Sequence, residues 1–407
     1  MLRHAILVWH RWVGLALAAF LIVEGLTGSL LVFREPLAHW LAPHDFARGP
    51  AGSAPLPLAT LATIAEARAP EGRVGYFSVE DHQAVMRVYP RDATSGRSLG
   101  WHLMILDPWT GRELRRLQGD RLDEGPVGWL GLAYDLHQNL LLGEWGTFVL
   151  GLVALAWTID CFLAVVLTLP KGRHSFLKRW RKAFAIKRRG SSSARLAVDL
   201  HRAGSLWLWL FLLVFAWSGV MLTLPLQVYD PVTSAVLDTR TLGQTMALVA
   251  GRAANATPHL DWHQAELRGA ALMADAARAH HFRVLRPYGM AYIREFGVYT
   301  YAVVTDANIG HHDWECSLWL DAGDGHLVSL ELPSGQHPGN TLGNWLHALH
   351  YADLADNLAY RWAVFAAGIA LAVLSATGVL IWLVKRRARR RARQFRTDHL
   401  ATMRTQQ

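Results

Sequence analysis

The sequence predicts a membrane protein whose fold is a four-helix transmembrane bundle with two α+β domains on one side of the bilayer. Of its 407 residues, 52% are hydrophobic and only 18% are charged, a composition unusual for a soluble enzyme. Four apolar stretches are long enough to cross a bilayer. The two long polar regions between them repeat one order of helix and strands, which indicates α+β structure.

The four predicted spans are residues 12–33, 148–169, 205–226 and 362–384. Each contains the roughly 20 apolar residues that a membrane-spanning helix needs. The first has no small-residue cleavage site and continues as LTGSLLVFREPL, so we expect it to be retained and not removed as a signal peptide.

Basic residues predict the orientation of these spans, because they gather on the cytoplasmic side. Between Pro170 and Asp199, in the loop that joins the second and third spans, there is no acid, and the basic residues are Lys171, Arg173, Lys178, Arg179, Arg181, Lys182, Lys187, Arg188, Arg189 and Arg195. The tail KRRARRRARQFR is equally basic, so both termini are expected in the cytoplasm. Residues 34–144 and 227–361 hold 19 Arg and no Lys against 28 acids and are expected outside. The formal charge of +9 therefore reflects topology and not nucleic-acid binding.

The two outer regions have similar patterns. In the first, LATLATIAEARA has helical spacing and precedes GYFSVE, AVMRVYP and WHLMILDPWTGREL, which alternate like strands. In the second, RGAALMADAARAHH precedes GVYTYAVVTD and ECSLWLDAGDGHLVSLELP. Asp-Pro with Thr-Gly in one, and Asp-Ala-Gly-Asp-Gly in the other, predict turns. A stretch rich in Pro, Gly, Ala and Ser at 43–57 is expected to link the first span to its domain.

These patterns give eight predicted segments. They are transmembrane helix 1 (1–36), an outer domain (37–135), transmembrane helix 2 (136–170), a basic cytoplasmic loop (171–199), transmembrane helix 3 (200–226), a second outer domain (227–345), transmembrane helix 4 (346–385) and a basic cytoplasmic tail (386–407).

Histidines recur at equivalent places on the spans. His10 is followed after eighteen residues by Gly28, and His201 after eighteen by Gly219. Spans two and four are preceded by DLHQNLLLGEWG and LHALHYADLADNLAYRW, which contain His137, His347 and His350. The predicted topology puts His10 and His201 at the cytoplasmic edge and the others at the outer edge.

Two imidazoles from different helices can fill both axial positions of a haem iron and give a low-spin centre for electron transfer. We therefore predict one haem between His10 and His201 and another between His137 and His350. His350 matches the position of His137 better than His347, which is expected to contact its neighbour ligand or a propionate. A single histidine at a helix end is more often a capping or interfacial residue, but four at repeated positions favour ligation.

Two acids, Glu24 and Asp160, lie inside apolar spans and are expected near mid-membrane. Such acids are costly and usually face the bundle interior, so they are candidates for proton handling or a quinol site. The alternative is a neutral, hydrogen-bonded packing role.

Other features predict less. His280-His281 and His311-His312 are metal candidates, but adjacent residues on a strand point apart and solvated surface is preferred. Cys161 and Cys316 are too isolated for a disulfide framework. Six aromatic residues fit a chelate-binding surface or, equally, a strand core, and are assigned no role: Trp314, Trp319, Tyr288, Tyr292, Tyr299 and Tyr301.

The sequence has no visible nucleotide or flavin motif, so electrons must come from another molecule. The candidates are a membrane quinol and a cytoplasmic reductase that docks on the basic loop. The alternative for that loop is positive-inside topology with contacts to anionic membrane lipids.

The chain resembles the PepSY-associated transmembrane (PepSY-TM) family, bacterial inner-membrane proteins that include ferric-siderophore reductases. The resemblance covers nearly the whole chain and rests on HRWVGLALAAFLIVEGLTGSLLVF, LHQNLLLGEWGTFVLGLVALAWTIDCFLAVVLTLP, DLHRAGSLWLWLFLLVFAWSGVML, LHALHYADLADNLAYRWAVFAAGIALAVLSATGVLIWL and LDPWTGREL. It implies two periplasmic PepSY-like domains and two haem b groups held by His10, His201, His137 and His350. It also implies electron transfer to an iron(III)-siderophore in the periplasm.

The main hypothesis is thus an inner-membrane di-haem reductase that releases iron as Fe(II). One alternative is the same electron path with another acceptor, such as sulfite, a copper or flavin centre, or a partner protein. The other is a colourless, non-enzymatic binding or regulatory protein, which would not need paired histidines.

Overall fold

The structure is a computed structural model that describes residues 1–50, 52–80, 82–91, 99–117, 125–172, 174–187, 192–250, 258–310, 314–354 and 357–405. The chain divides into two compact units. The membrane unit comprises Met1–Val32, His137–Thr223 and Trp362–Gln407. The sheet unit comprises Phe33–Leu136 and Leu224–Arg361.

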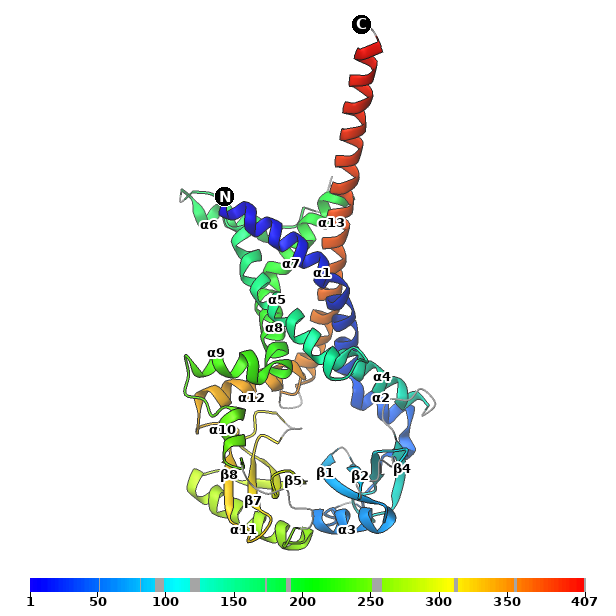
Figure 1. Cartoon of the computed structure of the whole chain (residues 1–407), viewed down its shortest axis with the longest axis vertical. Helices are drawn as coiled ribbons and strands as arrows, with labels where there is room; N and C mark the ends of the chain where they lie inside the picture. Colours follow the sequence, from blue (N-terminus) through cyan, green and yellow to red (C-terminus); the bar gives the residue numbers. More distant parts are fainter. Residues whose placement is uncertain are drawn as a thin grey trace. The chain divides into compact units, whose positions relative to one another are not determined.

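The membrane unit is built from long apolar helices that lie side by side (Figure 1). They are α1 (Leu2–Leu31), α5 (Glu144–Thr168), α7 (Ser193–Trp207), α8 (Trp209–Thr223) and α13 (Leu358–Thr405). Three, namely α1, α5 and α13, are long and apolar enough to cross a membrane, and the bent pair α7 and α8 gives a fourth if it is one span. Their shared core includes Leu17, Leu21, Val153, Leu212 and Leu371.

The third predicted span is not one straight helix. Helices α7 and α8 are bent by 70° at Leu208. The indole of Trp207 donates to the Phe184 carbonyl at 3.2 Å, and that of Trp209 donates to the Cys161 carbonyl at 3.0 Å. These two bonds tie the residues on either side of the bend to different partners. Apolar composition could not predict the bend, because both bonds are tertiary.

Helices α1 and α13 meet at two glycines. A Cβ on Gly25 would lie 2.5 Å from the Gly368 carbonyl oxygen, and one on Gly368 would lie 2.5 Å from that of Gly25. The Ser29 hydroxyl is 2.9 Å from the Phe365 carbonyl, to which it can donate across the same contact. The two backbones therefore approach too closely for larger residues.

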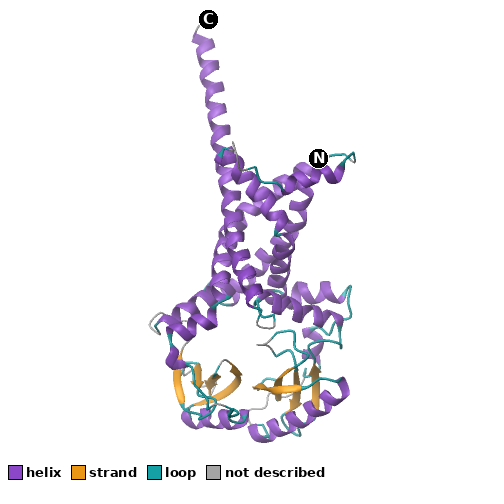
Figure 2. Ribbon diagram, turned by 180° about the vertical axis from the view of Figure 1, so that it is seen from behind, coloured by secondary structure: helices purple, strands orange, loops and turns teal. Residues whose placement is uncertain are grey.

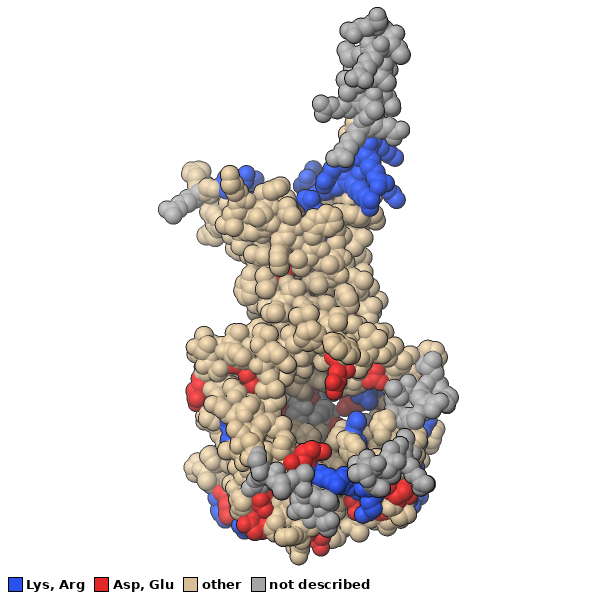
Figure 3. Space-filling model, viewed as in Figure 1, with Lys and Arg blue, Asp and Glu red and all other residues tan. Residues whose placement is uncertain are grey.

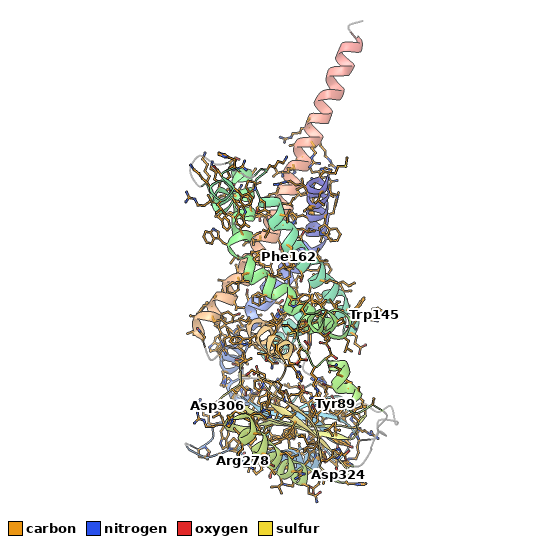
Figure 4. The ribbon with its side chains drawn as sticks, turned by 90° about the vertical axis from the view of Figure 1, so that its left-hand side faces the viewer. Tyr89, Trp145, Phe162, Arg278, Asp306 and Asp324 are labelled. Atoms are coloured by element: carbon orange, nitrogen blue, oxygen red, sulfur yellow. The ribbon has the colours of Figure 1, made fainter. Side chains whose placement is uncertain are left out.

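Charged side chains are sparse along the membrane unit and gather near α13 and α6 (Phe176–Trp180), as Figure 3 shows. The short helix η3 (Arg181–Phe184) follows α6 in the basic loop. Figure 4 labels Trp145 and Phe162, two aromatic residues of α5 whose rings are exposed on this unit. Apolar sides and basic ends are the pattern of membrane-spanning helices.

The sheet unit contains one eight-stranded antiparallel sheet in the order β4-β3-β2-β1-β5-β6-β7-β8. The strands are β1 (Gly72–Glu80), β2 (Gln83–Pro90), β3 (Leu103–Leu106), β4 (Glu113–Leu117), β5 (Val284–Ile293), β6 (Val298–Thr305), β7 (Ser317–Asp321) and β8 (Leu327–Glu331). Helices α3 (Leu58–Arg68) and α11 (Trp262–His280) pack along it (Figure 2). One apolar core runs beneath both halves and includes Leu61, Phe77, Met86, Met273 and Leu318.

The two halves of the sheet repeat each other down to their turns. Asp107 and Asp321 each accept two backbone N–H groups with a side-chain oxygen, in the β3–β4 and β7–β8 turns. Each turn ends in a glycine with positive φ, Gly111 at 67° and Gly325 at 74°. Glycine adopts this conformation without a steric penalty, so both predicted turns form by the same chemistry.

The sequence predicts two separate outer domains, whereas the structure joins them into one sheet. Strand β1 pairs with β5 through Tyr76↔Ala291, Phe77↔Met290 and Ser78↔Gly289. Two four-stranded halves bury more apolar surface together than apart, because their helices then share one core.

Shorter helices complete the sheet unit. They are α2 (Arg34–Leu41), η1 (Pro43–Asp45), α4 (Pro126–Asn139), η4 (Pro225–Tyr229), α9 (Asp230–Ser234), α10 (Leu242–Ala247) and α12 (Pro338–His350). The predicted linker at 43–57 packs on the sheet unit in its described part, since buried Asp45 pairs with Arg115 at 2.7 Å. The last residues of α4, from His137 onward, belong to the membrane unit.

Candidate histidine site in the membrane unit

His10 of α1 is held by a carboxylate from α5. Its Nδ1 lies 2.9 Å from Oδ2 and 3.0 Å from Oδ1 of Asp160, a buried acid inside the apolar helix. A carboxylate in its ionised form only accepts hydrogen bonds, and with such a partner Nδ1 carries the proton and donates. The lone pair of this imidazole is therefore on Nε2.

His201 of α7 is held in the same way by α13. Its Nδ1 lies 2.9 Å from the Leu374 carbonyl and 3.3 Å from the Thr377 hydroxyl. A carbonyl cannot donate, so Nδ1 again carries the proton and Nε2 the lone pair. The Thr377 hydroxyl itself can donate to Leu374, at 2.8 Å, which leaves its oxygen able to accept from His201.

The two rings of His10 and His201 lie together. Their centroids are 6.1 Å apart and their planes are tilted by 50°. Two imidazoles bound on opposite sides of one ion need a separation of about 6 Å, because each adds a metal–nitrogen bond of about 2 Å and about 1 Å from nitrogen to ring centre. The separation of the two ring centres therefore matches that of two axial ligands of a haem.

Glycines lie against the histidine rings. A Cβ on Gly378 of α13 would lie 3.2 Å from Cε1 of His201. A Cβ on Gly28 of α1 would lie 3.0 Å from Cε1 of His137. The glycine eighteen residues after His10 thus leaves room for a different histidine, His137, whereas its counterpart Gly219 lies against Ala154.

His137, in the last turn of α4, forms a second level of the membrane unit. Its Nδ1 lies 3.0 Å from Oε2 of Glu24 and 2.9 Å from the Thr27 hydroxyl. The Thr27 hydroxyl is 2.7 Å from the Val23 carbonyl, to which it can donate, so it can accept from His137. As at His10, carboxylate contact leaves the Nε2 lone pair for a ligand.

The two intramembrane acids belong to different histidine levels. His10 and Glu24 are separated by about 14 residues of α1, or about 21 Å at the helical rise. Asp160 lies with His10, and Glu24 lies with His137. Tertiary contacts therefore pair each acid with its own histidine, and the mid-membrane depth expected for both acids stays a prediction.

His347 and His350 lie on α12 in the sheet unit. The His347 ring stacks on Tyr351 with centroids 4.2 Å apart, and the His350 ring is tilted against the same tyrosine at 5.8 Å. Both histidines are half-buried. The choice between them as partner of His137 stays a prediction.

The remaining metal candidates have other roles or lie elsewhere. His280 and His281 are exposed at the end of α11, and His311-His312 fall outside the described residues. Glu315, which follows His311-His312 in the sequence HHDWEC, accepts the N–H groups of Ile309 and Gly310. These bonds give Glu315 a structural role, because they hold the loop that precedes it.

One exposed group, formed by Asp321, Asp324 and His326, has the spacing of a metal site within the described part of the chain. Asp321 accepts turn N–H groups, and Asp324 accepts from the backbone and ring of His326. Bonds from His326 also hold the pKa of Asp324 below its usual value. Hydrogen bonds within the β7–β8 turn therefore explain why these three side chains lie close together.

Tyr288, Tyr299 and Tyr301 are almost fully buried in or on the sheet. Of the two roles open to these aromatics, strand core is the one their burial supports. Burial also raises the pKa of Tyr301 to about 12.

The partners of the histidines were missed at the sequence level, although an internal comparison reveals them. Without gaps, α5 and α13 align Trp145 with Trp362, Phe148 with Phe365 and Gly151 with Gly368. The same alignment places Asp160 opposite Thr377, and these two residues contact the two facing histidines.

Fold and site together define a membrane protein with an internal repeat and half-buried, paired histidines. The chain belongs to the family described as the PepSY-associated TM region, whose model matches residues 7–385. No curated protein matches the sequence.

Proposed function

We propose that this protein is a bacterial inner-membrane reductase that carries electrons through two b haems to an iron(III)-siderophore in the periplasm, releasing iron as Fe(II). The observation that carries the proposal is the pairing of His10 and His201, with both Nδ1 atoms bonded and the rings 6.1 Å apart. Family membership supports the wider assignment.

In this proposal the chain supplies ligands and orientation. His10 and His201 hold the first haem, and His137 is one ligand of the second, with His350 as its predicted partner. When bound, the haems supply one-electron transfer. Asp160, Leu374 and Glu24 hold the histidine tautomers that expose Nε2.

The proposed orientation places both chain ends and the basic loop in the cytoplasm, and the sheet unit in the periplasm. The excess of basic residues near α6 and α13 supports it. Electrons would enter from quinol or from a cytoplasmic reductase. The siderophore would be reduced on the periplasmic side.

A reduced-minus-oxidised spectrum of the purified protein, with a pyridine haemochrome assay, tests this proposal. We expect two b haems per chain, and about one after His201→Ala or His137→Ala. His280→Ala, at an exposed histidine, is the matched control and should keep both. A colourless wild-type protein would instead indicate a binding or regulatory function.

The acceptor needs a separate assay. The reduced protein is mixed with an iron(III)-siderophore in the presence of an Fe(II) chelator, and haem oxidation and Fe(II) are followed together. Oxidation by sulfite or a copper centre, but not by the siderophore, would keep the electron path and replace the acceptor.

A further inference from the structure

We propose that Asp160 is a positioning residue that lowers the reduction potential of the haem held by His10 and His201 by making His10 a more basic ligand than His201. This inference rests on the proposed function. It concerns a position at which the two repeated helices present different chemistry to the paired histidines.

The inequality arises from the internal repeat. His10 and His201 are equivalent in α1 and α7, and Asp160 and Thr377 are equivalent in α5 and α13. His10 faces a carboxylate at 2.9 Å, whereas His201 faces a carbonyl at 2.9 Å and a hydroxyl at 3.3 Å. Similar geometry is thus combined with an acidic side chain on only one side.

The charge has a direct effect on the ligand. A charge-assisted hydrogen bond is about twice as strong as a neutral one, and it draws the Nδ1 proton toward the acid. The imidazole then becomes a more basic ligand. A more basic axial ligand and a nearby negative charge both favour ferric over ferrous iron, so the potential falls.

The second level has its own carboxylate from the same repeat. Glu24 contacts His137 at 3.0 Å, and the residue equivalent to Glu24 in the other repeat is Phe215, which has no hydrogen-bonding side-chain atom. Both carboxylates that contact these histidines therefore come from the first repeat. Glu24 provides a matched comparison at a different level.

The test is a potentiometric titration of the full-length, haem-loaded protein followed by its optical spectrum. Asp160→Asn keeps an acceptor oxygen for His10 and removes only the charge. We expect it to raise one midpoint potential and leave the other unchanged. Thr377→Asp, which gives His201 a carboxylate too, should lower that same potential.

Glu24→Gln is the matched control and should raise only the other potential. Unchanged potentials in Asp160→Asn and Thr377→Asp, with two haems still bound, would overturn this inference and leave the proposed function intact. If Asp160→Asn loses haem, Thr377→Asp tests the inference by itself. A lower midpoint potential in that variant supports the inference, and an unchanged or higher one contradicts it. A wild-type protein without haem would overturn both proposals, which the haemochrome assay detects independently.

Discussion

Single residues decide whether the histidine rings have room. Gly378 and Gly28 each lie against the Cε1 atom of a histidine ring, at 3.2 and 3.0 Å from the position of a Cβ. A branched side chain would push the imidazole out of place. Glycine at these two positions is therefore a requirement of the site and not of helix formation, which glycine weakens.

We expect Gly378→Val to remove the haem held by His10 and His201 and to keep the other, because valine displaces the His201 ring. Gly28→Val should have the converse effect through His137. The haem content of each purified variant checks this, with a fall from about two to about one. Gly14→Val, in open space on α1, is the control, and equal haem loss there would contradict the steric explanation.

The buried side chain of Tyr301 should make the stability of the sheet unit depend on pH in the alkaline range. Burial, followed by the charge of Glu266, raises the pKa of Tyr301 from 10.0 to about 12 in the folded state. The unfolded chain loses this proton first, so stability falls as pH rises from about 10 to 12, by up to about 1.4 kcal/mol per pH unit. Tyr301→Phe should reduce that slope.

Urea unfolding in detergent, followed by tryptophan fluorescence at several alkaline pH values, measures the slope. Tyr89→Phe, at an exposed ring, is the matched control. An unchanged slope in Tyr301→Phe would show that Tyr301 is not the group responsible.

At the scale of helices, the contact between α1 and α13 depends on backbone approach. Gly25→Ala would bring a Cβ within 2.5 Å of the Gly368 carbonyl, and backbone cannot rotate away as a side chain can. We expect a loss of about 1–3 kcal/mol in stability, typical of overpacking. Thermal unfolding of the detergent-solubilised protein measures it.

The control for this contact is Gly14→Ala on the same helix, where no atom lies within 4 Å. Alanine favours a helix over glycine by about 1 kcal/mol, so this variant should be equally or more stable. Destabilisation of the same size in both variants would assign the effect to α1 itself and not to its packing.

The helices and strands differ in how well their sequence predicts them. The predicted span 12–33 lies within α1 up to Leu31, and 362–384 lies within α13, because twenty apolar residues are a strong local signal. Strand β5 was not predicted, since Pro287 and Gly289 interrupt its alternation and coincide with an irregular register. The bend at Leu208 was also missed, because its tryptophan bonds reach residues distant in sequence.

At the scale of the whole sheet unit, β5 joins the two halves of the repeat. Gly289 pairs with Ser78 of β1, and a Cβ there would lie 2.4 Å from the Phe77 carbonyl. Gly289→Ala should therefore weaken the β1–β5 pairing by more than about 1 kcal/mol. Hydrogen exchange should show lower protection in β1 and β5 together.

Gly243→Ala on α10, where the nearest atom is 3.9 Å away, is the matched control and should leave exchange unchanged. Loss of protection in β5 alone would mean that the halves are stabilised independently. The two halves of the sheet would then be in contact but would not unfold as one cooperative unit.

The sequence by itself determined the membrane class, the apolar helices, the repeated histidines and most strands, because each is written in local composition, period or spacing. Only the tertiary structure decided that Asp160 contacts His10 and that Glu24 contacts His137. It also decided that the strands of the two predicted domains form one sheet. These are pairings between residues far apart in the chain. Local preference cannot specify them, because they depend on which surfaces the whole fold buries together.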